Sequence, residues 1–142
     1  MAYMSQEKKA ALAPAIKAVL AKYKMKGTIS VDNHSTLLVT LKEGALDLIA
    51  AANADNKAYA ERTNSPFYEV KNDYQVNPYY AHESTNKTVG SFFKELVAAM
   101  NGKNSTVKNH DNSDIMTDYF DIGWYVNIYV GKWNKPYNVK AA

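Results

Sequence analysis

The amino-acid sequence predicts an α+β fold in which an antiparallel sheet of two hairpins, about four strands, packs with two to three helices. Residues 115–133 and 28–42 each alternate apolar and polar side chains around a short turn, which is typical of hairpins with one buried face. Residues 5–23 and 88–100 place apolar side chains at helical spacing. Helices and hairpins that occupy separate stretches favour an antiparallel sheet over a parallel one. We expect a single domain over residues 1–142, because the chain has 142 residues.

The stretch 115–133 has the clearest pattern in the chain. In its second half four apolar side chains share one face: Trp124, Val126, Ile128 and Val130. The opposite face carries two tyrosines and an asparagine: Tyr125, Asn127 and Tyr129. Met116–Phe120 also alternates, so we predict that it forms the first strand of the hairpin. Gly123 is expected at the turn, since glycine adopts a positive φ without a Cβ clash.

The first third of the chain predicts a helix followed by a hairpin. Ser5 can cap a helix over residues 5–23, because its side-chain oxygen can accept a backbone N–H. Pro14 lies inside this helix and is expected to kink it, since proline removes a helical hydrogen bond. Two strands are predicted within residues 28–42, on either side of an Asn-His-Ser turn at residues 33–35.

The rest of the chain predicts two more helices and a polar tail. Residues 44–62 are rich in alanine and favour a helix, with a break expected near residues 53–56. The long loop that follows is expected to hide a short strand at residues 67–71. An apolar stripe predicts the next helix at residues 88–100. Pro136 is expected to stop the tail from pairing further with the sheet.

Composition excludes several classes of function. Hydrophobic residues make up 46% of the chain and charged residues 22%, as in folded proteins. There is no cysteine, hence no disulfide, thiol nucleophile or thiolate metal site. No glycine-rich phosphate loop is present, and we expect no cofactor. An intracellular, cytoplasmic home is the simplest expectation for a chain without cysteine. No apolar run is long enough to span a membrane, so we expect no membrane partner.

The densest polar cluster lies at residues 109–114. His110, Asp111 and Asp114 could form a metal or acid/base site, and would then centre a metal-dependent hydrolase. A calcium loop, however, needs a glycine at its sharp turn and a glutamate at its end, and this stretch has neither. Asn, Asp and Ser also serve turns by satisfying backbone donors. We therefore assign no catalytic and no metal-binding residue.

Tyrosine is unusually frequent, with 11 residues. Tyrosines on an exposed strand face can stack the bases of single-stranded nucleic acid. The same face could instead lie under helices or bind a protein. The net charge of +3 favours a protein partner, since phosphate contacts usually dominate nucleic-acid affinity. The residues expected to bind a partner are Tyr79, Tyr80, Tyr119, Tyr125, Asn127 and Tyr129.

Four motifs in the C-terminal third together resemble a family of small phage and prophage proteins of unassigned function. They are NHDNSD at 109–114, TDYF at 117–120, GWY at 123–125 and GKWNKPY at 131–137. Residues 25–31 and 76–79 are similar as well. The family has no assigned catalytic role, so the resemblance implies no active-site residue. It implies a phage-encoded protein that works in the cytoplasm of a bacterial host.

These observations lead to one leading expectation and two alternatives. The first is a non-enzymatic accessory protein that binds a host macromolecule, a host protein above all, in host takeover or against host defence. The second is a single-stranded nucleic-acid-binding protein that uses the tyrosine-lined face. The third is the metal-dependent hydrolase. An exposed tyrosine face would also favour a homodimer, because it would leave an uncovered aromatic patch.

Overall fold

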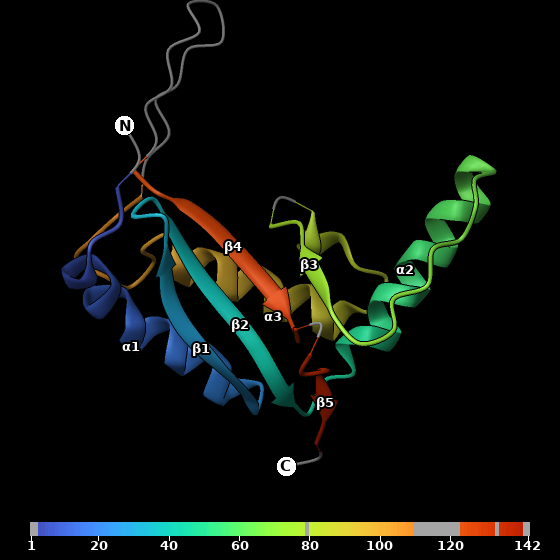
Figure 1. The fold of residues 1–142 in the computed structure, drawn as a ribbon, viewed down its shortest axis with the longest axis horizontal. Coiled ribbons are helices and arrows are strands. Elements are labelled where there is room, and N and C mark those ends of the chain that lie inside the picture. Colours follow the sequence, from blue (N-terminus) through green and yellow to red (C-terminus); the bar gives the residue numbers. More distant parts are fainter. Residues whose placement is uncertain (1–2, 79, 110–122, 133, 141–142) are drawn as a thin grey trace, which may run out of the picture.

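The computed structural model confirms the α+β class (Figure 1). It describes residues 3–78, 80–109, 123–132 and 134–140. Within these ranges the elements follow in the order α1 (Gln6–Lys22), β1 (Met25–Asp32), β2 (Thr36–Gly44), α2 (Leu48–Thr63), β3 (Tyr74–Val76), the 3-10 helix η1 (Ala81–Glu83), α3 (Lys87–Met100), β4 (Tyr125–Val130) and β5 (Asn138–Val139).

The sheet has the strand order β1-β2-β4-β3, and β5 pairs with β2. The first predicted hairpin is confirmed: β1 and β2 are antiparallel, and Asn33 and His34 adopt the positive φ of 53° and 58° that suits a tight hairpin turn. The sheet is mixed, however, rather than antiparallel throughout, because β4 and β5 run parallel to β2. A parallel pair needs a long crossover, and the chain between β2 and β4 contains both α2 and α3.

The second half of the other predicted hairpin is confirmed as β4. Its expected partner, Met116–Phe120, lies outside the described residues. Among the described strands, β4 pairs with β2 on one side and with β3, antiparallel, on the other. The expectation for the tail is wrong: beyond Pro136 the chain returns to the sheet as β5, because Pro136 itself needs no ladder bond and the two residues of β5 follow it.

The hydrophobic core lies between the sheet and the helices α1 and α3, which cover the same sheet face (Figure 1). Its centre contains side chains with no exposed surface: Leu12, Ile16, Leu37, Val39, Leu41, Phe92, Leu96, Met100, Ile128 and Val130. Trp124 is buried at one end, where its indole Nε1 donates to the carbonyl oxygen of Met100 over 3.0 Å. Burial of this apolar surface stabilises the packing of both helices on the sheet.

The first and third helices match their predictions closely. Ser5 caps α1 by accepting the backbone N–H of Lys8 over 3.1 Å. The helix runs through Pro14 from Gln6 to Lys22. At its end, Lys22 forms an ion pair of 2.6 Å with Glu95 of α3, and the hydroxyl of Tyr23 donates to the same carboxylate. These two hydrogen bonds hold the pKa of Glu95 below its usual value.

Helix α2 projects away from the rest of the fold, and the segment after it runs back along it towards β3 (Figure 1). The break expected near residues 53–56 is wrong, since α2 is continuous from Leu48 to Thr63. Instead of ending the helix, Asn53 binds the returning segment through its side-chain amide. Its Nδ2 donates to the carbonyl oxygen of Val70 over 2.8 Å, and its Oδ1 accepts the backbone N–H of Val70 over 2.6 Å. The strand expected at residues 67–71 is also wrong, because side chains of α2, rather than another strand, satisfy this backbone.

Candidate functional site

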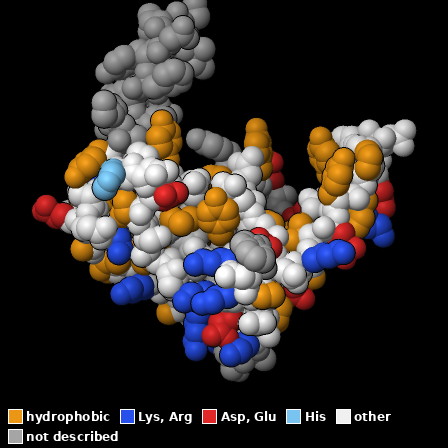
Figure 2. All heavy atoms as spheres, in the orientation of Figure 1, with side chains coloured by type: hydrophobic (Ala, Val, Ile, Leu, Met, Phe, Trp, Pro, Cys, Tyr) orange, Lys and Arg blue, Asp and Glu red, His pale blue; other side chains and the backbone are white. Residues whose placement is uncertain are grey.

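One face of the sheet is left open by the described helices. In β4, Tyr125, Asn127 and Tyr129 alternate with the buried Ile128 and Val130, and therefore point away from α1 and α3. Figure 1 shows both helices behind the sheet, and Figure 2 shows the opposite face from the front. Tyr125 is 47% exposed on it. Asn127 and Tyr129 are half-buried, so Tyr125 is the most accessible of the three side chains.

The register extends this face across the neighbouring strands. Asn127 pairs with Leu38 of β2, and Tyr129 pairs with Thr40 of β2 and with Gln75 of β3. Paired residues share a sheet face, so small or neutral side chains surround the tyrosines. Because Tyr125 and Tyr129 are four residues apart, their Cα atoms lie roughly 13 Å from each other along the strand. We call this surface, from Tyr125 to Gln75 and to the buried Thr40, the open face.

Lysines gather at one end of the open face. Lys42 follows Thr40 on the same side of β2, Lys132 and Lys135 lie in the turn after β4, and Lys140 follows β5. They line a depression of about 400 Å³. Its lining holds one carboxylate, Glu43, against these four lysines, which leaves a formal charge of +3. Figure 2 shows basic side chains below the centre of this face.

The turn that carries Lys132 and Lys135 is held by backbone hydrogen bonds and by a buried tyrosine. Gly131 has a φ of +71°, which favours glycine, and the backbones of Lys132 and Lys135 exchange hydrogen bonds of 2.9 and 3.0 Å. Tyr137 anchors the chain behind the turn: its ring is buried, and its hydroxyl donates to the oxygen of Leu46 over 2.7 Å. Lys140 forms an ion pair of 2.8 Å with Glu43, which lowers the pKa of that carboxyl. The fold therefore fixes where the lysine backbones lie.

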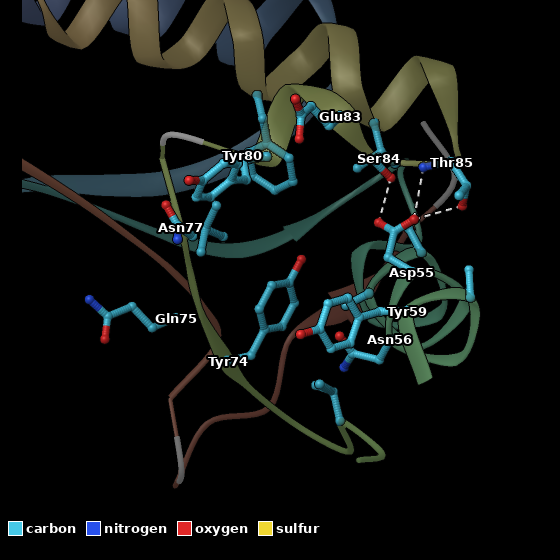
Figure 3. A pocket seen from close by; sticks show the side chains of 18 of the residues that line it. Asp55, Asn56, Tyr59, Tyr74, Gln75, Asn77, Tyr80, Glu83, Ser84 and Thr85 are labelled. Carbon is cyan, nitrogen blue, oxygen red and sulfur yellow. Dashed lines mark hydrogen bonds between the residues drawn. The ribbon is translucent and has the colours of Figure 1, made fainter. Parts of the chain in front are cut away.

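A second concave surface, the cleft, lies between α2, β3 and the segment that leads into α3 (Figure 3). Its volume of about 770 Å³ is within the range of small-ligand sites. Tyr59 of α2, Tyr74 of β3 and Tyr80 before η1 line it, each from a different element. Burial, and then the nearby charge of Asp55, raise the pKa of the Tyr74 hydroxyl well above its usual value.

Asp55 of α2 joins two walls of the cleft by hydrogen bonds to Ser84 and Thr85, which precede α3. Its carboxylate accepts hydrogen bonds from the Ser84 hydroxyl at 2.7 Å, from the Thr85 N–H at 2.8 Å and from the Thr85 hydroxyl at 2.6 Å. Figure 3 shows these bonds as dashed lines between α2 and the segment before α3. Asp55 thus acts as a tether between two walls.

The structure brings only some of the sequence-predicted residues together. Tyr125, Asn127 and Tyr129 share the open face, whereas Tyr80, 64% exposed, lines the cleft. The remaining candidates lie outside the described residues: Tyr79, Tyr119, His110, Asp111 and Asp114. No group of three or more metal-ligating side chains occurs in the described part of the chain.

Sequence reasoning missed the lysine end of the open face and the whole cleft. Lys42 is far in sequence from Lys132, and only the parallel pairing of β2 with β4 brings the ends of these strands together. The cleft depends on how α2 leaves the sheet, for which the sequence carries no local signal. The three lysines between residues 132 and 140 were the signal in the sequence that could have indicated the lysine end of the open face.

No protein-family model, curated protein or solved structure matches the chain. Among the helices formed by described residues, none has the length and apolar character needed to cross a membrane.

Proposed function

We propose that the protein binds single-stranded nucleic acid on the open face. The observation that carries this proposal is the position of two tyrosines, the exposed Tyr125 and the half-buried Tyr129, on a sheet face that ends in a cluster of lysines. Aromatic side chains on an uncovered sheet stack bases, and basic side chains beside them bind the phosphates.

The distribution of charge makes nucleic acid the better partner for this face. A weak overall charge of +3 argues against it only if the cations are evenly spread. Four lysines around one depression give that depression a formal charge of +3, equal to the charge of the whole chain. A protein interface usually has few lysines, whereas a polyanion is attracted to them.

The proposed mode of binding is stacking plus charge, without chemistry on the ligand. The Cα atoms of Tyr125 and Tyr129 lie about 13 Å apart along the strand, so the two rings would stack bases that are not adjacent in the nucleic acid. Asn127 and Gln75 lie on the same face and carry amides that can hydrogen-bond base edges. Lys42 and Lys132 would contact the backbone where the strand leaves the sheet.

The cellular setting is also a proposal. The resemblance of the C-terminal motifs to phage proteins leads us to place the protein in the cytoplasm of an infected bacterium. Single-stranded DNA and RNA are both present there. The three candidate residues of the metal-dependent hydrolase lie outside the described residues, so that alternative stays a prediction.

The test is fluorescence anisotropy with labelled single-stranded DNA, single-stranded RNA and duplex DNA at low and physiological salt. Tyr129→Ala should weaken single-strand binding about fivefold or more, since one stacked base is worth about 1–3 kcal/mol. Tyr129→Phe keeps the ring and should bind nearly as well. The double variant Lys132→Gln/Lys135→Gln should bind with a weaker salt dependence. The slope of log affinity against log salt concentration should become shallower by about 0.7 for each phosphate contact that is lost.

The control is Tyr68→Ala, which removes a tyrosine that is 74% exposed on the arm formed by α2 and its returning segment. It should bind like the parent protein. Binding that survives Tyr125→Ala/Tyr129→Ala unchanged, or no binding even at low salt, would refute the proposal.

A further inference from the structure

The cleft has the opposite charge to the lysine end of the open face. Its charged lining residues are Asp55, Glu83 and Arg62, a formal charge of −1 in a chain whose charge is +3. Glu83 is exposed and has no ion-pair partner among the described residues. The cleft therefore disfavours phosphate and favours a cation.

The walls of the cleft are aromatic as well as acidic. Figure 3 shows the Tyr74 hydroxyl pointing into the space between the three elements, with Tyr59 on the α2 side and Tyr80 and Glu83 on the η1 side. A cation gains energy over the face of such a ring. Burial is the main cause of the raised pKa of Tyr74, and the nearby charge of Asp55 adds to the rise.

One cationic side chain of this protein, Arg62, already makes a cation–π contact with a tyrosine of the cleft. The guanidinium of Arg62 lies 5.6 Å from the centroid of the Tyr59 ring. Arg62 and Tyr59 are three residues apart on the exposed part of α2, so this contact is local and leaves the rest of the cleft unfilled. The aromatic wall is thus available to a second cation that approaches from outside.

We propose that the cleft binds a basic side chain, lysine or arginine, from a partner protein. The stem of such a side chain fits the apolar floor made by Ala51, Val76 and Val89, while its head reaches Glu83 and the tyrosine rings. The volume of about 770 Å³ exceeds one side chain, so neighbouring residues of the partner enter as well. This docking site shares Gln75 with the open face but is otherwise separate from it, and it does not depend on nucleic-acid binding.

The test is an NMR titration of the ¹⁵N-labelled protein with a short blocked lysine derivative, N-acetyl-lysine methylamide, and with its neutral counterpart, N-acetyl-norleucine methylamide. The lysine compound should shift amide signals of residues 51–59, 74–77 and 80–85, with a Kd in roughly the millimolar range. The norleucine compound should bind about tenfold more weakly, because it offers no charge to the carboxylate and the rings.

Two variants and a matched control sharpen the test. Glu83→Gln and Tyr80→Ala should each weaken lysine binding about two- to fivefold. Glu61→Gln removes an exposed carboxylate of α2 outside the cleft lining and should change nothing. Tyr125→Ala/Tyr129→Ala should also leave lysine binding intact, which separates this site from the open face.

Equal binding of the lysine and norleucine compounds would overturn the proposal, since the cleft would then be only an apolar pocket. So would an absence of shifts at concentrations about tenfold above the millimolar range, or shifts confined to residues outside the cleft.

Discussion

Replacement of Asp55 by alanine should lower the free energy of unfolding by about 2 kcal/mol. Three hydrogen bonds of 2.6–2.8 Å from Ser84 and Thr85 end on this carboxylate. A hydrogen bond to a charged group contributes about 1.5–3 kcal/mol when buried. Both bonds from Thr85 are exposed, which reduces the total to about 2–3 kcal/mol. Alanine has a higher helix propensity than aspartate, which offsets roughly 0.5 kcal/mol of this loss in the free energy of unfolding.

The assay is urea denaturation followed by circular dichroism. Asp55→Asn keeps one acceptor oxygen, so its loss should be about 1 kcal/mol. Glu61→Gln, a neutralised carboxylate elsewhere on α2, should stay within about 0.5 kcal/mol of the parent protein. If Asp55→Ala lowers the free energy of unfolding by less than about 0.5 kcal/mol, Asp55 does not stabilise the fold by joining α2 to the segment before α3. The three hydrogen bonds would then make no net contribution to stability.

Two further predictions concern contacts that helix α3 makes with other elements. Glu95→Gln should destabilise the protein more at pH 7 than at pH 3. The pKa of Glu95 is lowered in the fold by Lys22 and Tyr23, so its contribution is fully present above the unfolded pKa and is lost as the pH falls through the folded pKa. Urea midpoints at both pH values check this, and an equal loss at both would contradict it. Trp124→Phe should cost about 2–4 kcal/mol, because it opens a cavity and leaves the oxygen of Met100 without its donor. Thermal unfolding measures the loss, and a value below about 1 kcal/mol would exclude a central role for this indole.

The sequence predicted those structural features that depend on residues close together in the chain. The stripe of α3, the cap at Ser5 and the turn at Asn33 and His34 each arise within a few residues. The alternation in β4 likewise placed Tyr125 and Tyr129 on the face opposite the core, because successive strand residues point to opposite sides.

The sequence alone determined the α+β class and the grouping of Tyr125, Asn127 and Tyr129, since periodicity fixes which side chains share a face. Only the tertiary structure decided that β4 lies parallel to β2, and this pairing brings Lys42 beside the turn of Lys132. It also decided that α2 stands away from the sheet to form the cleft. Contacts between residues so far apart in the chain depend on how whole elements bury their apolar faces together, and no local pattern encodes that choice.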